Sequence, residues 1–192
     1  MRGSMLWRGF LIAAIIGLAL FVVNYHVPLS GTKTVIYDFR TADGIVSHVY
    51  PVSRVRDMAH ADGRAYRPMI EDPVYADVKT LLPYRAAHVD LIFENTTSIP
   101  LAMGVKRADG TPSFDLKSIE NVQREGKWAR GSVSFDLSHA RYYDSKYTFA
   151  FSVPGLRTEH TDQGEVRLSR MTLTLERAPF FWSDITSLWK KF

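Results

Sequence analysis

The sequence predicts an all-β fold, an antiparallel β-sandwich of about eight strands, flanked by an N-terminal transmembrane helix and a short C-terminal amphipathic helix. Apolar and polar residues alternate in many short runs between residues 34 and 179, which is the pattern of half-buried strands. Residues 9–29 carry no formal charge, and the last residues place their aromatic side chains on one helical face. With 192 residues, 46% of them hydrophobic, the chain can build one domain with a sizeable core.

We expect residues 9–29 to form the membrane anchor, because a helix of about 20 residues crosses the hydrocarbon of a bilayer. Trp7 and Tyr25 would then lie at the two headgroup levels. A cleaved signal peptide is the alternative interpretation, although no Ala-x-Ala-like site follows the apolar run.

Arg2 and Arg8 precede the anchor, so the positive-inside rule keeps residues 1–8 in the cytoplasm. A linker at 30–33 and a β-sandwich domain at 34–179 follow. The sequence therefore predicts a single-pass protein of the cell membrane whose domain is periplasmic or extracellular.

The strands are predicted from a hydrophobic pattern that repeats every two residues. In 146–153, the apolar residues Tyr147, Phe149 and Phe151 alternate with small or polar residues, as in a strand with one buried face. The same alternation occurs in 132–137 and 88–95 and, more weakly, in 34–39 and 74–81.

The last strand changes face along its length. Leu168 is even-numbered, whereas the apolar residues from Met171 onward are odd-numbered. We expect either a bulge near Ser169 and Arg170 or a break into two strands.

Two segments fit this scheme poorly. Residues 113–124 could form one short helix. Residues 44–67 are polar with little alternation, which indicates either a binding loop or partner contact, or an extended edge strand. Their His48 and His60 have no spacing that supports a metal site, so no metal is expected.

The order of the closing strands carries a family resemblance. Gly126-Lys127-Trp128 opens an aromatic-capped strand, a polar strand follows, then a Tyr-x-Phe-x-Phe-x-Val-Pro-Gly strand at 147–155, and a final alternating strand. This run, residues 126–177, resembles jelly-roll, galactose-binding-like and carbohydrate-binding-module domains. The resemblance implies a jelly-roll-like sandwich and suggests sugar binding. The chain departs from the sugar binders in having Trp128 as the one tryptophan of the domain.

Candidate ligand-binding residues follow from that resemblance, because sugar-binding sandwiches stack aromatic faces on sugar rings and bind hydroxyl groups with charged or amide side chains. The candidates are Trp128, Arg130, Arg141, Tyr142, Tyr143 and Asp144. A second polar and aromatic stretch runs from Tyr66 to Tyr75. In the alternative interpretation, these aromatic residues cap the core at strand ends.

Charge and motifs exclude several classes of function. The net charge is +4, but five of the 24 basic and one of the 20 acidic residues lie outside 34–179, so the domain is formally neutral and nucleic acid is not an expected partner. The chain has no cysteine, which excludes disulfides and thiolate chemistry. No hydrolase elbow, zinc-protease motif or phosphate-binding loop occurs, and no cofactor is expected.

The tail at 180–192 predicts an amphipathic helix that lies on the membrane interface or on a membrane partner, and packing on the domain's own sandwich is the alternative. Its apolar residues fall within an arc of roughly 120° on a helical projection. They are Phe181, Trp182, Ile185, Leu188, Trp189 and Phe192.

Together these features predict a membrane-anchored extracytoplasmic binding or accessory module. We expect it to be carbohydrate-related and to accompany a membrane enzyme or exporter that handles surface glycans. The alternative is a structural protein-interaction subunit of an envelope assembly such as secretion, pilus or division machinery. No catalytic residue is proposed, and a hydrolase ranks third.

Overall fold

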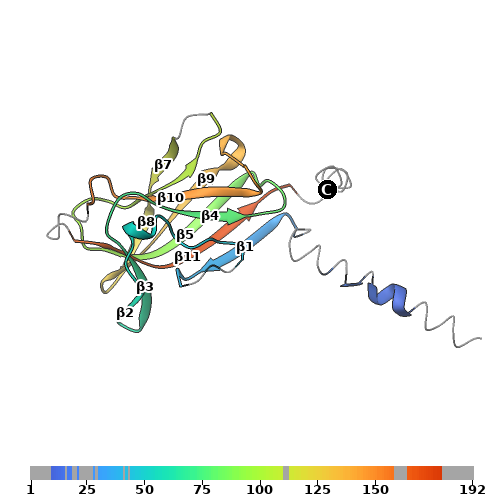
Figure 1. Cartoon of the computed structure of the whole chain (residues 1–192), viewed down its shortest axis with the longest axis horizontal. Coiled ribbons are helices and arrows are strands. Elements are labelled where there is room, and N and C mark those ends of the chain that lie inside the picture. The colour runs from blue at the N-terminus through green and yellow to red at the C-terminus, as the bar shows by residue number, and fades with distance from the viewer. Residues whose placement is uncertain are drawn as a thin grey trace, which may run out of the picture. The chain divides into compact units, whose positions relative to one another are not determined.

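The computed structural model describes residues 10–15, 17, 18, 21, 28, 30–40, 42, 44–109, 113–157 and 164–178. Residues Thr34–Arg177 form one compact unit, and the chain on either side of it belongs to a second unit. The described part of the compact unit consists almost entirely of strands joined by turns (Figure 1).

Eleven strands are present in the described residues, against the predicted eight or so. They are β1 (Thr32–Tyr37), β2 (Ala59–Ala61), β3 (Arg64–Met69), β4 (Val74–Lys79), β5 (Ala86–Asn95), β6 (Ala102–Lys106), β7 (Phe114–Ser118), β8 (Glu120–Glu125), β9 (Trp128–Asp136), β10 (Lys146–Ser152) and β11 (Val166–Glu176). Two short 3₁₀ helices, η1 (Val52–Arg54) and η2 (Leu137–His139), complete the described elements of this unit.

The strands form two antiparallel sheets, which confirms the predicted sandwich. The seven-stranded sheet has the order β2-β3-β11-β5-β9-β8, with β1 also paired to β11. The four-stranded sheet has the order β4-β10-β6-β7. The long strands β5 and β11 run side by side through the larger sheet (Figure 1).

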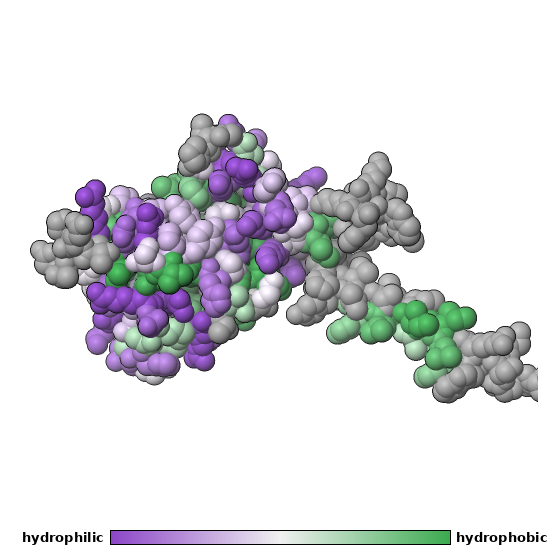
Figure 2. Space-filling model, viewed as in Figure 1, coloured by the Kyte–Doolittle hydropathy of each residue, from purple (hydrophilic) through white to green (hydrophobic). Residues whose placement is uncertain are grey.

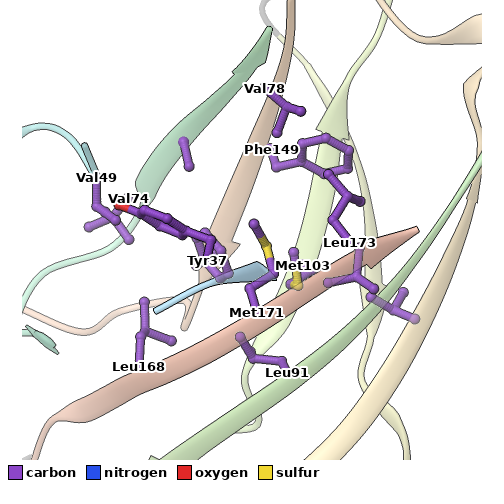
Figure 3. Packing of buried hydrophobic residues seen from close by; sticks show 14 of the residues in the cluster. Tyr37, Val49, Val74, Val78, Leu91, Met103, Phe149, Leu168, Met171 and Leu173 are labelled. Carbon is purple, nitrogen blue, oxygen red and sulfur yellow. The ribbon is translucent and has the colours of Figure 1, made fainter. Parts of the chain in front are cut away.

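Alternation places one face of each sheet in a shared core. Phe135 of β9 and Phe149 of β10 meet across the sandwich with ring centroids 5.9 Å apart. Figure 3 shows Met103 and Phe149 of one sheet in the same cluster as Leu91 and Met171 of the other. Burial of such apolar surface is the main term that stabilises the domain.

The predicted bulge in the last strand is confirmed. The pairing of β11 with β5 shifts register between Leu168 and Arg170. Ser169 is the extra residue, and its hydroxyl donates to the Ala65 carbonyl at 2.9 Å. The bulge keeps both Leu168 and Met171 in the core.

The prediction of a short helix at 113–124 is wrong. This segment forms β7, which pairs with β6, and β8, which pairs with β9, so the chain passes from one sheet to the other near Ile119. Phe114 and Leu116 lie two residues apart on one face of β7, which is a strand period rather than a helical one.

The polar segment 44–67 also proves to be mostly extended. Val46 and Tyr50 bridge to β4, Val55 bridges to β3, and the remainder contains the β2–β3 hairpin. The interpretation as extended edge structure therefore describes this segment better than a free loop does.

The other unit includes helical residues of the expected anchor. Residues 10–15, 17, 18 and 21 are helical, and their side chains are exposed and apolar or small (Figure 2). Within the described residues, no helix has both the length and the hydropathy needed to cross a bilayer. The residues expected at the membrane interface lie outside the described ranges: Trp7, Tyr25, Phe181, Trp182, Ile185, Leu188, Trp189 and Phe192.

Candidate functional site

The outer face of the four-stranded sheet, the one turned away from the core, gathers aromatic and charged side chains. On β4, Val74, Ala76 and Val78 are buried in the core, so Tyr75 and Asp77 lie on the outer face. The residues in register with Tyr75 on this face are Ala150 of β10, Gly104 of β6 and Leu116 of β7.

Tyr50 extends this face beyond the edge of the sheet. Its segment runs antiparallel to β4, where the amide of Tyr50 donates to the Tyr75 carbonyl at 2.9 Å and the amide of Tyr75 donates back at 2.7 Å. Because the two tyrosines form a bridge pair, their side chains share a face, and their ring centroids lie 5.5 Å apart.

Tyr75, Tyr50 and Phe114 form what we call the aromatic row. The rings of Tyr75 and Phe114 are stacked, with centroids 5.4 Å apart and planes inclined by 22°. The positions in register with Tyr75 on β10 and β6 carry only Ala150 and the glycine Gly104, and Phe114 lies two residues from the β7 end of that row. A Cβ atom on Gly104 would lie 2.8 Å from Cδ2 of Leu116 and 3.2 Å from Cβ of Phe114, so this glycine makes room for the β7 side chains.

Asp77 organises the polar half of the outer face. Its carboxylate accepts hydrogen bonds from the Tyr50 hydroxyl at 2.9 Å and the Thr148 hydroxyl at 2.7 Å. The ammonium of Lys146 donates to its other oxygen at 2.8 Å. Four side chains from three segments are therefore locked together beside the aromatic row.

This network shifts the pKa of its members. Burial alone raises the pKa of Asp77, but the hydrogen bonds from Lys146, Thr148 and Tyr50 outweigh burial and lower it. The hydrogen bond to Asp77 raises the pKa of Lys146. Burial, followed by the hydrogen bond to Asp77, raises the pKa of Tyr50 to about 12. All three groups therefore keep their charge state through the neutral range.

A pocket of about 180 Å³ opens beside this network, and we call it the cationic pocket. Its lining residues are Tyr50, Lys106, Arg141, Tyr143, Lys146 and Thr148. Three of the six are cationic and none is acidic. The pocket therefore joins aromatic surface, hydroxyl groups and positive charge at one place.

The predicted ligand-binding loop at 141–144 contributes two of its four residues to this pocket. Arg141 and Tyr143 line it, and the guanidinium of Arg141 lies 5.2 Å from the centre of the Tyr143 ring. Tyr143 is 67% exposed. Tyr142 is half-buried instead, with its hydroxyl donating to the Thr80 carbonyl at 2.7 Å, and Asp144 is exposed in the adjoining turn at φ 52°.

The structure places Trp128 and Arg130 on the other sheet, away from Arg141 and Tyr143. Trp128 is only 4% exposed, and its ring packs edge-on against Tyr66 at a centroid distance of 5.8 Å. The sequence predicted Trp128 as a stacking surface for a sugar, but in the structure it is a packing residue.

Two hairpin tips meet beside Trp128. Arg64 of the β2–β3 hairpin pairs with Glu125 at 3.3 Å, and Lys127 of the β8–β9 turn pairs with Asp62 at 3.7 Å. At these contacts the tips of the two hairpins lie beside each other, and Tyr66 of the β2–β3 hairpin packs on the outward-pointing ring of Trp128.

A larger pocket of about 450 Å³ lies near the 95–101 turn and includes Ile119, Arg124 and Lys127 in its lining. The polar groups of its turn bond to one another, with the Asn95 amide donating to the Ile99 carbonyl at 2.7 Å and the Thr97 amide donating to Asn95 at 2.9 Å. The polar side chains of this turn are therefore engaged with one another, while Arg124 and Lys127 also line the pocket. In the described ranges, no cluster of three or more metal-ligating side chains occurs.

Sequence reasoning missed Tyr50, Lys106, Lys146, Thr148 and Phe114 as site residues. The alternation of 74–81 predicts that Tyr75 and Asp77 share the outward face. The pairing of Tyr50 with Tyr75 and the approach of Phe114 arise from tertiary structure, for which the sequence contains no local signal.

Comparison with known proteins gives structural neighbours only. No family model matches the chain, and no curated protein matches it significantly. Among solved structures, the CBM22-1 xylan-binding domain of Xyn10C from Paenibacillus barcinonensis is similar at 11% identity and a TM-score of 0.49, covering 78% of this chain and 98% of that chain. The C-terminal CBM6 of LamC from Zobellia galactanivorans is similar at 10% identity and a TM-score of 0.44, covering 74% and 99%.

A family 35 carbohydrate-binding module from Clostridium thermocellum is a further neighbour, at 13% identity and a TM-score of 0.42, covering 73% of this chain and 97% of that chain. These three neighbours are carbohydrate-binding modules, the class of domain that the closing strands resemble. Identity and TM-score are both too low for these likenesses to assign a ligand to this chain.

Proposed function

We propose that the domain is a non-catalytic carbohydrate-binding module whose site is the outer face of the four-stranded sheet. The observation that carries the proposal is the aromatic row beside the cationic pocket, since aromatic side chains from three separate segments converge next to free polar groups. Convergence of this kind from distant parts of a chain is typical of a binding site.

The chemistry of a sugar matches both halves of this face. A pyranose ring has CH-rich faces that pack against aromatic rings, and hydroxyl groups that need donors and acceptors. Tyr143 offers an exposed ring, while Lys106 and Arg141 offer donors that make no hydrogen bond through their side chains to another described residue.

The same face is poorly suited to hydrolysis. Asp77, at its centre, accepts three side-chain hydrogen bonds, and its lowered pKa keeps it ionised. A general acid in a glycosidase needs a raised pKa and a free proton. These properties support binding rather than catalysis.

The proposed module is anchored in the cell membrane by residues 9–29, with a cytoplasmic N-terminus and the domain outside the cytoplasm. The charge pattern around the apolar run supports this arrangement, as do the exposed apolar side chains of the helical residues between 10 and 21. A module held at the membrane is suited to accompany an enzyme or exporter that handles surface glycans.

Retention of the full chain, purified in mild detergent, on immobilised xylan, mannan and polygalacturonate tests carbohydrate binding directly. Tyr143→Ala should weaken retention on the bound polysaccharide about tenfold, which corresponds to loss of about 1.4 kcal/mol. Ile36→Ala, which removes another exposed apolar side chain from β1 of the other sheet, is the control and should bind normally. Failure to bind any of these or any other glycan would contradict the proposal.

One observation favours the alternative of a protein-interaction subunit. In the described part of the chain β7 pairs only with β6, and its Leu116 is 49% exposed beside Phe114. An open strand edge with apolar side chains is a common docking surface for another protein. Stable co-purification of one stoichiometric partner, lost on Leu116→Asp and accompanied by no glycan binding, would favour this alternative.

A further inference from the structure

We infer that the carbohydrate bound at the cationic pocket is anionic, carrying carboxylate or sulfate groups. This inference rests on the proposed function and names the class of glycan for the same site. The charges around the pocket are unbalanced, although the domain as a whole is formally neutral.

The positive charge of the pocket is only partly neutralised. Lys146 is paired with Asp77 at 2.8 Å, which leaves Lys106 and Arg141 as two cations with no ion-pair partner in the described residues. Lys79 pairs in register with Lys146 across β4 and β10, so a fourth cation lies near the same end of the sheet. Asp144 acts on Lys146 from the adjoining turn but does not line the pocket.

The form of these cations suits a carboxylate. Arg141 is positioned by its contact with the Tyr143 ring, and its side chain makes no hydrogen bond to another described residue. A guanidinium binds a planar carboxylate with two parallel hydrogen bonds, and such charge-assisted bonds are stronger than those to neutral hydroxyl groups. The ammonium of Lys106 adds a second donor to the same pocket.

A neutral sugar would match this arrangement less well. Its hydroxyl groups could accept from Arg141 and Lys106, but the repulsion between neighbouring cations would remain. An anionic group relieves that repulsion and forms the stronger bonds, so each negative charge on the glycan should add to affinity. Surface charges of this kind are screened by salt, which makes the effect measurable.

The test compares polygalacturonate with its methyl ester, since the two share a backbone and differ in charge. Dextran sulfate and dextran form a second matched pair. We expect the full chain to bind the charged member of at least one pair about tenfold more tightly at low salt and to lose that preference near 1 M salt, where the Debye length is about 3 Å.

Arg141→Gln should remove most of the preference for the charged member, whereas Arg130→Gln should retain it. Arg130 is an arginine with a side chain that is 65% exposed on the outer face of the other sheet, so it is a matched control for charge. Equal loss in the two variants would show general attraction by net charge and would overturn the inference.

The failure modes of the two proposals are distinct. Equal or tighter binding of the neutral members would overturn the inference and leave carbohydrate binding intact. Absence of binding to every charged and neutral glycan would overturn both. If the double variant Arg141→Gln with Lys106→Met keeps the preference for the charged member, the anion binds outside this pocket. That result would overturn the inference as well.

Discussion

Tyr75 and Phe114 lie on opposite edge strands of the four-stranded sheet, yet their rings are stacked with centroids 5.4 Å apart. Two strands separate them, and the outward positions in register with Tyr75 on those strands are occupied by Ala150 and Gly104. Small residues in the middle of a sheet thus allow two large rings from its edges to meet. This contact turns an ordinary outer face into a continuous aromatic surface.

Gly104→Val should damage this surface. The added side chain would approach Leu116, the Asp115 carbonyl and Phe114, which are 2.8, 3.1 and 3.2 Å from the position of a Cβ atom. We expect a loss of about 2 kcal/mol in the free energy of unfolding, as for other overpacked sites, together with weaker glycan binding. Denaturant unfolding of this variant beside Ala102→Val, on the same strand, measures the effect; equal stability of the two would contradict it.

Asp77→Asn should lower the free energy of unfolding by about 1–2 kcal/mol, because it removes the charged partner of Lys146. The loss stays modest because the Lys146 side chain is 34% exposed and is solvated once its partner loses charge. The lowered pKa of Asp77 means that the wild-type advantage is present above the ordinary aspartate pKa of about 4 and is lost as pH falls through the lower pKa of the folded state.

Chemical unfolding of the wild type and Asp77→Asn across pH should therefore show a difference in the free energy of unfolding near neutral pH, and this gap should close in acid. Asp144→Asn is the control, since Asp144 is exposed and asparagine tolerates its positive φ of 52°. A gap that persists unchanged well below pH 4 would show that the charge of Asp77 is not the cause.

Trp128→Ala should destabilise the domain by about 3 kcal/mol, since it removes a large buried ring from its contact with Tyr66. Trp128→Phe keeps most of the ring and should fold with a smaller loss. Glycan binding by the folded Trp128→Phe variant should equal that of the wild type in a direct titration. Loss of binding with unchanged stability would return Trp128 to the site.

Deletion of residues 1–29 should release the protein from the membrane fraction, because the apolar run is the expected anchor. Any residual binding to liposomes should fall further on Trp182→Ser with Trp189→Ser, which tests the predicted interfacial tail. Fractionation and liposome flotation of the two forms measure this. Equal membrane association of the deleted and full chains would contradict the anchor.

Alternation along the chain was sufficient to predict much of the fold. The runs around Phe149 and Val133 became β10 and β9, and the parity change between Leu168 and Met171 predicted a bulge or a strand break, of which the structure shows the bulge. These features depend on local periodicity, because a strand with one buried face must alternate and a bulge must change its parity.

The site was less predictable because it depends on which strands meet. Nothing local shows that Tyr50 pairs with Tyr75 or that Phe114 crosses toward β4. Trp128 lies at an outward position of β9, so alternation alone predicts exposure. The pairing of Arg64 with Glu125 brings two hairpins together beside it, and only the tertiary structure reveals this.

Carbohydrate binding at the outer face of the four-stranded sheet is tested by hydrogen–deuterium exchange of the full chain with and without saturating polygalacturonate oligosaccharides, or whichever glycan the chain retains. Binding at this face should protect 48–50, 75–79, 104–106 and 141–148, with no change in 128–132. Protection confined to 95–101 and 119–129, around the larger pocket, would place the ligand there instead and show the proposed site to be wrong.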